Sequence, residues 1–417
     1  MDEIGFLKSL FDCAVAAADP MLCVPKALPP KPDGRVFVTG AGKASARMAE
    51  AVETVWGPCE GLVITRYGYA RSCQGIEIVE AAHPVPDAAG ADATDRVLSH
   101  LEGLGADDTV IALISGGASA LLVKPAGDMT LAEKQELNEA LLRSGAAIDE
   151  MNVVRKHLSG VKGGQLAAAA WPAKMHALII SDVAGDDPAF IGSGPTVGVA
   201  STPSDALAIL TRYGIELSAA AAAVLAHPTG VLDPNAPHLA GVDNQVVAAP
   251  SLSLDAAQAM AEEYGTVVTT LGDQITGEAR DVAASHANMA KTMRAVAQSS
   301  GKAQVILSGG ECTVTRRGDG LGGPNAEYAL AAALALDGAP GIYAIAGDTD
   351  GVDGAAEVAG AIIGPDTLVR ASEIGISPSA SLEQNDSHGF FAAIDAQVVT
   401  GPTLTNVNDF RAFLVTP

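Results

Sequence analysis

The stretch from residue 152 to residue 196 reads NVVRKHLSGVKGGQLAAAAWPAKMHALIISDVAGDDPAFIGSGPT and joins a basic cluster, an apolar run and an acidic loop. The apolar run, Ala177 to Ile180, is typical of a buried strand in a parallel sheet. Its carboxyl end leads into a loop that contains Asp182 and Asp186. Ligands of open α/β sheets bind at that end of the strands. The stretch therefore predicts an α/β fold with a polar site directly after this strand.

Four basic side chains precede this strand in a chain that is otherwise strongly acidic. Arg155, Lys156, His157 and Lys162 fall within eight residues. Cations suit a phosphate or a carboxylate, and nearby acids suit Mg²⁺. Phosphoryl transfer requires this combination, because its catalysis is mostly positioning and charge neutralisation. The alternative is a helix with a solvated basic face followed by an Asp-rich turn, and the density of the cluster favours the functional interpretation.

Length and charge restrict the class of protein. A chain of 417 residues exceeds the size at which single hydrophobic cores stop growing, so two domains are expected. The formal charge of −24 opposes general affinity for nucleic acid or an anionic membrane and favours small-molecule substrates. No apolar run approaches the roughly 18 residues of a membrane span, and the scattered cysteines contain no CxxC pair. A cytoplasmic protein without a zinc site or a disulfide framework is therefore expected. The sequence does not determine whether the protein forms a homo-oligomer.

Strand-like and helix-like segments alternate from Val36 to Thr196. This alternation predicts a Rossmann-like, doubly wound, mainly parallel sheet. Residues 227–243 are rich in proline and glycine and mark the expected domain boundary. The predicted division is 1–235 for the Rossmann-like domain, which begins with an amphipathic helix, and 236–417 for a smaller α/β domain. The alternating series of the second domain is expected to begin with a strand at Val246.

A short strand at Val36 to Val38 runs into the turn Gly40-Ala41-Gly42-Lys43-Ala44-Ser45 and then into a helix. A glycine turn that opens a helix favours an anion, and the ammonium of Lys43 could reach one. The turn fits neither standard nucleotide motif. A Walker A loop needs Ser or Thr where this chain has Ala44, and GxGxxG needs a glycine where it has Ser45. The turn therefore predicts an anion site and supports a dinucleotide site only weakly.

The motif Ser-Gly-Gly follows an apolar strand at two places, Ser115 to Gly117 and Ser308 to Gly310. Small residues let backbone N–H groups approach a ligand at the start of a helix, whose N-terminus favours negative charge. We interpret both motifs as phosphate-facing loops, although a tight strand-to-helix turn alone would explain each. The segment Gly318 to Gly323 is expected to form a flexible loop that ends at a helix with Pro324 near its first turn.

The segment after a later apolar strand carries Asp348, Asp350 and Asp353. An EF-hand would place glycine sixth and glutamate twelfth, whereas here a glycine is fourth and an alanine twelfth. Contact with Mg²⁺ or a nucleotide is the functional interpretation, and an Asx-stabilised turn is the structural alternative. His83, between two stiff peptide units in HPVPD, is interpreted as a structural histidine.

Together these segments resemble the type II glycerate kinases of the MOFRL family, some of which carry the older label hydroxypyruvate reductase. The resemblance runs almost end to end and rests on ten motifs in the family's order. They are GAGKAS at Gly40, HPVPD at His83, SGGASALL at Ser115, VRKHLSGVKGGQLA at Val154, SDVAGDDP at Ser181, SGPT at Ser193, SGGE at Ser308, GLGGPNAEYALA at Gly320, GDTDGVDG at Gly347 and TGPTLTNVNDF at Thr400.

The resemblance implies a two-domain α/β protein whose active site lies in the cleft between its domains. It also implies phosphorylation of D-glycerate by ATP with Mg²⁺, usually to 2-phosphoglycerate, and it places Lys43 of the GAGKA motif in the site. One departure concerns charge, because several relatives have an arginine and a glutamine where this chain has Pro324 and Ala326. The side chains that could supply the charge instead are Arg155, Lys156, Arg316 and Arg317.

The candidate site residues fall into four groups. Lys43 would neutralise phosphoryl charge, Asp182 would act as base or orient the glycerate hydroxyl, and Arg155 with Lys156 would hold the carboxylate. Further substrate-binding candidates are Ser45, Ser115 and Lys162. The nucleotide-binding candidates are Gly116, Gly117, Ser119, Gly309, Gly310, Glu311, Asn325 and Glu327, and the metal-binding candidates are Asp186, Asp348 and Asp350.

Two other functions compete with the kinase. An NAD(P)H-dependent hydroxypyruvate reductase is disfavoured, because no strand is followed by a complete GxGxxG with an acidic residue about 20 positions later. A non-catalytic sensor of a sugar acid or nucleotide is disfavoured, because a binding module needs fewer polar loops at strand ends. The expected cofactors are accordingly ATP and Mg²⁺.

Overall fold

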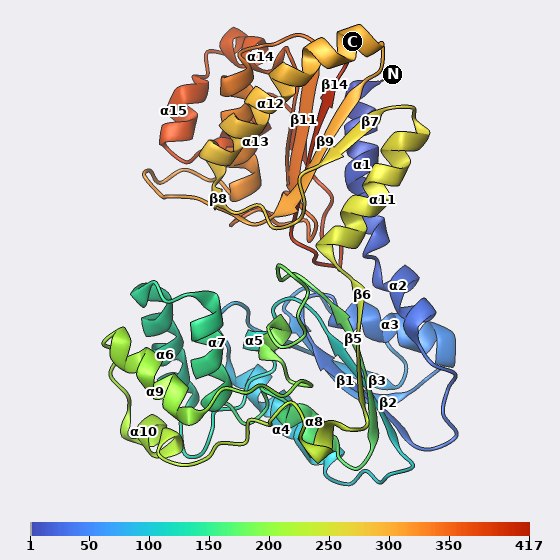
Figure 1. Ribbon diagram of the computed structural model, residues 1–417, viewed down its shortest axis with the longest axis vertical. Coiled ribbons are helices and arrows are strands. Elements are labelled where there is room, and N and C mark those ends of the chain that lie inside the picture. The colour runs from blue at the N-terminus through green and yellow to red at the C-terminus, as the bar shows by residue number, and fades with distance from the viewer. Residues whose placement is uncertain (1) are drawn as a thin grey trace. The chain divides into compact units, whose positions relative to one another are not determined.

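The computed structural model describes residues 2–417, and the chain divides into two compact units. One unit comprises Pro20–Val247, and the other combines the segment that ends at Asp19 with Ala248–Pro417. Each unit has its own sheet with helices on its faces (Figure 1). The chain is therefore a two-domain α/β protein, as its alternating pattern predicts.

The unit Pro20–Val247 is built on a six-stranded sheet with the order β3-β2-β1-β4-β5-β6. Its strands are β1 (Val36–Ala41), β2 (Glu60–Arg66), β3 (Ile76–Ala81), β4 (Thr109–Ile114), β5 (Lys174–Ile180) and β6 (Val242–Ala248). Strands β1 to β5 pair in parallel. The chain winds outward in one direction from β1 and in the other from β4, which creates a topological switch point between these two strands. A ligand is expected there, beyond the carboxyl ends of the strands.

Helices cover both faces of this sheet. They are α2 (Pro20–Ala27), α3 (Ser45–Trp56), α4 (Ala88–Leu101), α5 (Ala118–Leu121), α6 (Leu131–Ser144), α7 (Ile148–His157), α8 (Gln165–Ala170), α9 (Pro203–Arg212) and α10 (Ala219–Leu225), with short turns η1 (Ile191–Ser193) and η2 (Pro237–Leu239). Phe37, Leu62 and Val110 share a core with α4 and α8. Val38 alternates with Phe37 and points to the opposite face, where α3 packs against β1 and β2. This double winding confirms the predicted Rossmann-like sheet.

Four of these helices, α6, α7, α9 and α10, form a separate layer with an apolar core of its own (Figure 1). Leu141 of α6, Val154 of α7, Ile209 of α9 and Leu225 of α10 are buried in it. Helix α6 begins at a capping box in which Thr130 and Glu133 satisfy each other's backbone N–H groups. Because α7 carries the basic cluster, this layer determines where the cations lie.

The other unit has a mixed sheet with the order β13-β12-β11-β14-β9-β7. Its strands are β7 (Val267–Thr270), β9 (Gln304–Gly310), β11 (Ile342–Asp348), β12 (Gly360–Ile363), β13 (Gln397–Val398) and β14 (Asp409–Val415), and β8 (Gly277–Glu278) pairs with β10 (Cys312–Thr313). Only β7 and β9 are parallel among the described pairs of the large sheet. One face packs on α12 (Ala279–Ser300), α13 (Pro324–Leu336), α14 (Thr367–Glu373), α15 (Pro378–Glu383) and α16 (Ser387–Ala393), and the other on α1 (Glu3–Ala17) and α11 (Pro250–Glu263).

Helix α1 belongs to this second unit, although the sequence places it in the domain 1–235. Its apolar side chains, among them Leu7 and Phe11, are buried against α11 and β14, and the ring of Phe11 lies 6.0 Å from that of Phe410. The amphipathic pattern specifies a helix with one apolar face, which is confirmed. The pattern does not specify which sheet covers that face, because any apolar layer of suitable size would bury it.

The strand at Val246 also differs from its predicted place. It is part of β6, the edge strand beside β5, where the N–H of Met175 donates to the carbonyl of Gly241 at 3.0 Å. The first sheet therefore takes the strand that was expected to begin the second series. The compact units accordingly differ from the predicted division 1–235 and 236–417 at both the beginning of the chain and the boundary.

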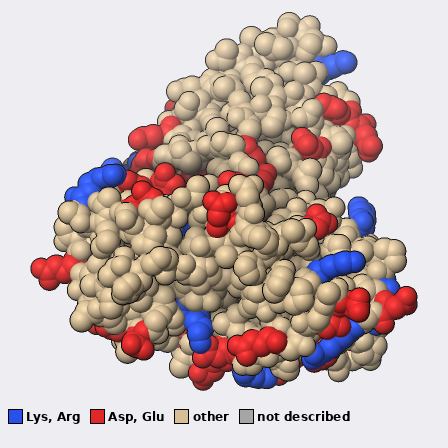
Figure 2. All heavy atoms as spheres, turned by 60° about the horizontal axis from the view of Figure 1, so that its bottom comes forward, with Lys and Arg blue, Asp and Glu red and all other residues tan. Residues whose placement is uncertain are grey.

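Among the charged residues of the chain, 49 acidic ones outnumber 25 Lys and Arg. On the face shown in Figure 2, aspartates and glutamates are spread widely, and the basic side chains lie between them rather than in one continuous patch. Among the helices of residues 2–417, none combines the length and apolarity needed to cross a membrane. Because the face in Figure 2 has no continuous basic patch, we look for an anion site among the charged side chains inside the fold.

Candidate active site

Two turns meet at the switch point of the parallel sheet, one after β1 and one after β4. The N–H of Lys43 donates to the carbonyl of Gly116 at 2.8 Å, and the N–H of Ala44 donates to Ser115 Oγ at 3.0 Å. Ser45 Oγ donates to a carbonyl of β4 at 2.9 Å and lies 3.2 Å from Ser115 Oγ. Both serines are fully buried, so their hydroxyl groups fasten one turn to the other.

Gly117 brings two side chains together beside these turns. Its φ of +84° lies in the left-handed region, and a Cβ atom placed on it would lie 3.0 Å from His83 Cδ2 and 3.5 Å from Lys43 Cγ. His83 belongs to the loop after β3, so three strand ends contribute to one place. The interpretation of His83 as a structural histidine stays a prediction, and its place after a parallel strand is what brings it beside Gly117.

Arg155 of α7 lines a cavity of about 610 Å³ together with Gly117 and Ser119. Burial lowers the pKa of Arg155 below its ordinary value. None of the described aspartates or glutamates lies within ion-pair distance of Arg155, whereas the exposed Arg96 pairs with Glu77. Because this guanidinium is partly buried and charges withdrawn from water are normally paired, it is suited to an anionic ligand.

Lys156 connects the basic helix with the acidic loop. Its side chain is 4% exposed, and its Nζ lies 5.3 Å from the centre of the Phe190 ring in the loop after β5. Burial lowers the pKa of Lys156, and the charge of Asp187 acts in the opposite direction. The next residue, His157, instead lies 2.7 Å through Nδ1 from Thr229 Oγ1 and is part of the helical layer. The basic cluster and the acidic loop of the opening stretch are therefore neighbours in space.

Two lysines are buried beneath the turn after β4. Lys162 Nζ donates to the carbonyl oxygens of Ser119 at 2.8 Å and Leu122 at 3.0 Å. Burial lowers the pKa of Lys162 well below its ordinary value, and the nearby positive charges lower it further. Lys134 Nζ donates to the carbonyl of Leu158 at 2.9 Å, and burial lowers the pKa of Lys134 to about 8. These lysines hold the backbone around the site in place.

The loop after β5 contains three aspartates in different environments. Ser181 is the first residue after β5, and Asp182 is the second and is partly exposed. Asp186 has a φ of +55°, and its Oδ1 atom is buried without a hydrogen-bond partner among the described residues. Asp187 Oδ1 accepts a hydrogen bond from the N–H of Ala189 at 2.9 Å and caps a turn. An orphaned, buried carboxylate oxygen suits a hard cation such as Mg²⁺.

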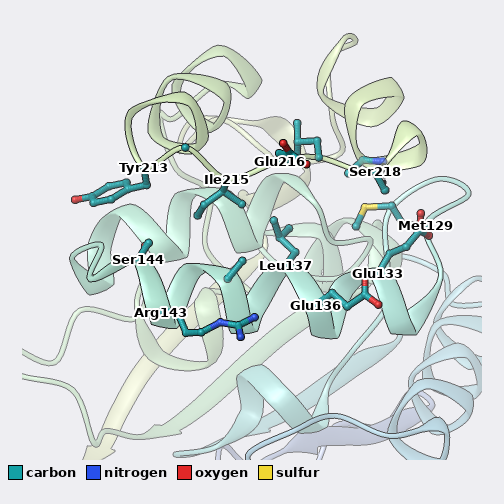
Figure 3. Close-up of a pocket in the computed structure, with 14 residues that line it drawn as sticks. Met129, Glu133, Glu136, Leu137, Arg143, Ser144, Tyr213, Ile215, Glu216 and Ser218 are labelled. Carbon is teal, nitrogen blue, oxygen red and sulfur yellow. Dashed lines mark hydrogen bonds between the residues drawn. The ribbon is translucent and has the colours of Figure 1, made fainter.

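A second cavity, of about 470 Å³, is also bordered by α6 (Figure 3). Figure 3 shows Glu133, Glu136 and Arg143 on this helix, and Glu216 in the segment between α9 and α10. Three carboxylates line the cavity against one guanidinium. A phosphate or a substrate carboxylate would be repelled there, so the switch point is the better anion site.

The second Ser-Gly-Gly motif has a different structure from the first. Gly309 and Gly310 are the last residues of β9 and pair with Phe410 and Asp409 of the antiparallel strand β14. Glu311 is exposed, and the chain continues into β10 instead of a helix. The predicted second strand-to-helix turn is therefore wrong, because the neighbouring strand continues the ladder through both glycines. A nucleotide-binding role for Gly309, Gly310 and Glu311 stays a prediction.

Asn325 and Glu327 lie in the first turn of α13 and have partners within their unit. Asp353 accepts hydrogen bonds from the N–H groups of Asn325 at 3.0 Å and Ala326 at 2.8 Å, and so caps the helix. Arg280 donates to Glu327 at 2.7 Å. Asn325 Oδ1 is buried without a described partner. These bonds give both residues a structural role, and their contact with a nucleotide stays a prediction.

Asp348 and Asp350 form successive Asx turns after β11. Asp348 Oδ1 accepts from the N–H of Asp350 at 2.9 Å, and Asp350 Oδ1 accepts from the N–H of Val352 at 2.8 Å. Across residues 2–417, no group of three or more His, Cys, Asp or Glu side chains is arranged to hold a metal ion. The structural alternative for this loop is thus present, and metal binding by Asp348 and Asp350 stays a prediction.

The glycine-rich segment 318–323 is packed closely, although a flexible loop was expected. The N–H of Gly318 donates to Asn385 Oδ1 at 2.9 Å. A Cβ atom on Gly323 would lie 2.4 Å from Asp353 Cγ. The glycines therefore allow close approach to neighbouring backbone, a need that composition alone does not distinguish from freedom of movement. Pro324 is the first residue of α13, as predicted.

Two family models match the chain in succession, a domain of unknown function named DUF4147 over residues 6–226 and the MOFRL family over residues 304–409. A D-glycerate 2-kinase of Thermotoga maritima is 38% identical over 96% of this chain and 96% of its own length. A glycerate 2-kinase of Pyrococcus horikoshii is 34% identical over 99% and 97% of the two chains. A protein of Agrobacterium vitis with the provisional name hydroxypyruvate reductase is 52% identical over 98% and 94%.

A solved structure extends this similarity to the fold. The crystal structure of glycerate kinase from Thermotoga maritima matches with a TM-score of 0.90 at 36% identity, covering 99% of each chain. The similarity therefore includes both units and the connections between their elements. The order of motifs, the two sheets and these full-length matches lead to one conclusion: the chain belongs to the type II glycerate kinases of the MOFRL family.

Proposed function

We propose that this protein transfers the γ-phosphoryl group of ATP to D-glycerate and forms 2-phosphoglycerate. The observation that carries the proposal is the pair of cations near the switch point, where Lys43 approaches Gly117 and Arg155 lines the adjoining cavity without an acidic partner. Both substrates are anions, so a positively charged site in a chain of net charge −24 fits them. The Thermotoga and Pyrococcus relatives are named as glycerate 2-kinases, which supports glycerate as the phosphoryl acceptor.

The reaction follows from the chemistry of these side chains. The hydroxyl oxygen of glycerate forms a bond to the γ-phosphorus, the bond from that phosphorus to the bridging oxygen breaks, and ADP leaves. Asp182 accepts the hydroxyl proton, while Lys43 neutralises charge on the transferring phosphoryl group. Arg155 and Lys156 hold the glycerate carboxylate. A guanidinium can bind a carboxylate through two hydrogen bonds, which orients the hydroxyl for attack.

The buried polar residues support this site indirectly. Lys162 donates to the turn after β4, and Ser45 and Ser115 tie that turn to the Lys43 turn. We therefore assign these three side chains a positioning role in place of direct contact with glycerate. Positioning of this kind matters, because small displacements of reacting groups lower the rate strongly.

Mg²⁺ would neutralise the phosphate oxygens of bound ATP. The orphaned Oδ1 atom of Asp186 makes this carboxylate the best-supported protein ligand. Mg²⁺ is typically held by one or two carboxylates together with substrate phosphates, so a cluster of several protein acids is not required. Asp348 and Asp350 remain the other proposed ligands.

The competing reductase function is less compatible with the turn after β1. A Cβ atom on Gly40 would lie 2.0 Å from the carbonyl oxygen of Leu113, and one on Gly42 would lie 2.0 Å from Ser115 Oγ. These glycines are required by the neighbouring strand and turn, whereas dinucleotide-binding glycines make room for a pyrophosphate. This contact disfavours NAD(P)H binding at the turn.

Two assays separate the functions. Purified protein is incubated with ATP, Mg²⁺ and D-glycerate while ADP is followed, and separately with NADH and hydroxypyruvate while NADH is followed. Phosphorus NMR of the product distinguishes 2-phosphoglycerate from 3-phosphoglycerate. The kinase proposal predicts glycerate-dependent ADP formation and no oxidation of NADH. Oxidation of NADH without ADP formation would establish the reductase, and activity in neither assay would favour a sensor.

A further inference from the structure

We propose that the cavity of about 610 Å³ beside α6 binds the adenosine part of ATP, an inference that rests on the proposed kinase function. The cavity is bordered by three elements of the unit Pro20–Val247, namely the loop after β3, the turn after β4 and one face of α6, and by Arg155. It adjoins Gly117, where Lys43 and His83 meet. A nucleoside in this cavity would direct its phosphates toward the proposed reaction site.

The size of the cavity favours a nucleoside over glycerate. Cavities that bury drug-sized ligands have volumes of about 300–1,000 Å³. A three-carbon acid would leave most of the 610 Å³ to water. On α6, the lining residues extend from Gln135 to Leu142, a distance of roughly 10 Å at a rise of 1.5 Å per residue. This wall is long enough to accompany a base and a ribose.

The lining combines apolar surfaces with hydrogen-bonding groups. Val85 of the β3 loop is 60% exposed and Leu142 of α6 is 62% exposed, and both border this cavity. A planar base between side chains from two elements would remove this apolar surface from water. The amide of Asn138 can bond the edge of a base, and the carboxylate of Glu139 can accept from an amino group or a ribose hydroxyl. These features match a neutral, flat and partly polar ligand.

Charge also orients such a ligand. Arg155 supplies positive charge to the cavity, whereas Glu136 and Glu139 on α6 supply negative charge. Phosphate groups favour the end of the cavity at Gly117, which Lys43 approaches, and are repelled by the glutamates, while a nucleoside carries no charge of its own. A second sugar acid would place an anion beside the α6 carboxylates. The charge pattern therefore fits a nucleotide better than two small acids.

The test removes the apolar surfaces and leaves the charges. In the double variant Val85→Ser/Leu142→Ser, the KM for ATP and the Kd for ADP, measured by titration calorimetry on the full-length protein, are expected to rise about 10-fold, because each buried methylene contributes about 0.8 kcal/mol. The KM for glycerate is expected to stay within about 2-fold. Ile148→Ser is the matched control, because Ile148 is similarly exposed at 60% but does not line this cavity.

Each outcome decides the proposal. A rise in the KM for glycerate with unchanged ADP affinity would assign the cavity to the acid and overturn the inference, as would unchanged constants for both ligands. ADP binding that weakens in the double variant, in a protein that shows no glycerate kinase activity, would sustain the nucleoside site and reject the proposed function. Thermal denaturation checks that the variants are folded, which is expected because both side chains are mainly exposed.

Discussion

The two Ser-Gly-Gly motifs share three letters and an apolar strand but have different structures. Ser115, Gly116 and Gly117 follow the parallel strand β4 at the switch point and form the turn that leads into α5. Ser308, Gly309 and Gly310 continue within β9, because the antiparallel strand β14 pairs with them. The difference teaches that the neighbouring strand, rather than the motif, decides whether backbone N–H groups are available to a ligand.

The two motifs also differ in whether the cations near them have acidic partners. Near the first, Lys134 and Lys162 are buried and Arg155 is partly buried, and none of the three has a described acidic partner. Near the second, Arg411 donates to the buried carboxylate of Asp409, and burial raises the pKa of Asp409 to about 6 despite that partner. A paired cation completes a structure, whereas an unpaired one leaves charge for a ligand. Four experiments examine this contrast.

Alanine at the last glycine of each motif is expected to give the largest difference in stability between the two motifs. Gly310 has a φ of +101°, and a Cβ atom would lie 2.4 Å from backbone atoms of Ile275, so Gly310→Ala is expected to lower the free energy of unfolding by roughly 3 kcal/mol or more. The Cβ atom of Gly117→Ala meets only the side chains of His83 and Lys43, so this variant is expected to lose about 1 kcal/mol of stability and about 10-fold in kcat/KM.

Urea denaturation and steady-state kinetics of both glycine variants provide the measurement. A lower stability of Gly117→Ala than of Gly310→Ala would contradict the assignment of a functional role to the first motif and a structural role to the second. The same assignment would be contradicted if Gly310→Ala kept the stability of the unmodified chain.

Replacement of Lys43 tests the proposed catalytic role of the site beside the first motif without changing the stability of the fold. Lys43→Ala is expected to lower kcat on the order of 10²-fold or more while the unfolding transition stays unchanged, because its charge acts mainly in the transition state. Lys302→Ala provides the control at an exposed position. A kcat close to that of the unmodified protein would remove Lys43 from the mechanism.

Variants of Asp182 and Asp87 distinguish a proposed catalytic aspartate from one that caps a helix. Asp182→Asn is expected to lower kcat about 10-fold or more, because an amide cannot accept the hydroxyl proton. Asp87 accepts from the N–H of Gly90 at 3.0 Å and from the hydroxyl of Tyr67 at 2.8 Å, which caps α4, so Asp87→Asn is expected to change stability more than turnover. Equal losses of kcat in the two variants, at matched thermal stability, would contradict the ranking.

The buried lysines predict a small dependence of stability on pH. The pKa of Lys134 is about 8 in the folded chain and 10.5 ordinarily. Between these values the unfolded chain binds a proton that the folded chain has lost, so stability rises with pH in that window and is independent of this group below it. The rise is expected to be on the order of 1 kcal/mol, because local opening relieves part of the burial.

Lys134→Met should reduce this rise and leave the part that comes from Lys162, whereas Lys302→Met should keep the rise in full. Urea denaturation at several pH values between 8 and 10.5 gives the comparison. Parallel curves for the unmodified protein and Lys134→Met would show that Lys134 retains its proton over this range, and that the charge beneath the turn is better solvated than its burial indicates.

The sequence predicts the strands well because their signal is local. The apolar runs at Val110 to Ile114 and Ala177 to Ile180 coincide with β4 and β5, and their polar successors identify the functional edge. The order of strands is not local, since it depends on which neighbours pair. For this reason the sequence identified Lys43 as a candidate but missed that His83 lies beside Gly117.

Long-range partners explain the remaining differences. The amphipathic pattern from Ile4 to Ala14 does not determine which sheet buries the helix, and the apolar strand at Val246 does not determine which sheet it joins. The glycines of 318–323 pack against the segment around Asn385, some sixty residues later. A single sequence records the composition of such a loop, whereas its rigidity depends on a distant segment.

Helix α1 has a consequence for the synthesis of the chain. It is synthesised long before two of the strands that cover its apolar face, β11 and β14, which are completed only at Asp348 and Val415. The unit Pro20–Val247 is continuous and can fold while translation proceeds, since domains generally fold as they emerge. During that interval Phe6, Leu7, Leu10 and Phe11 have none of their final partners. The nascent protein therefore exposes an apolar helix face until these strands are made.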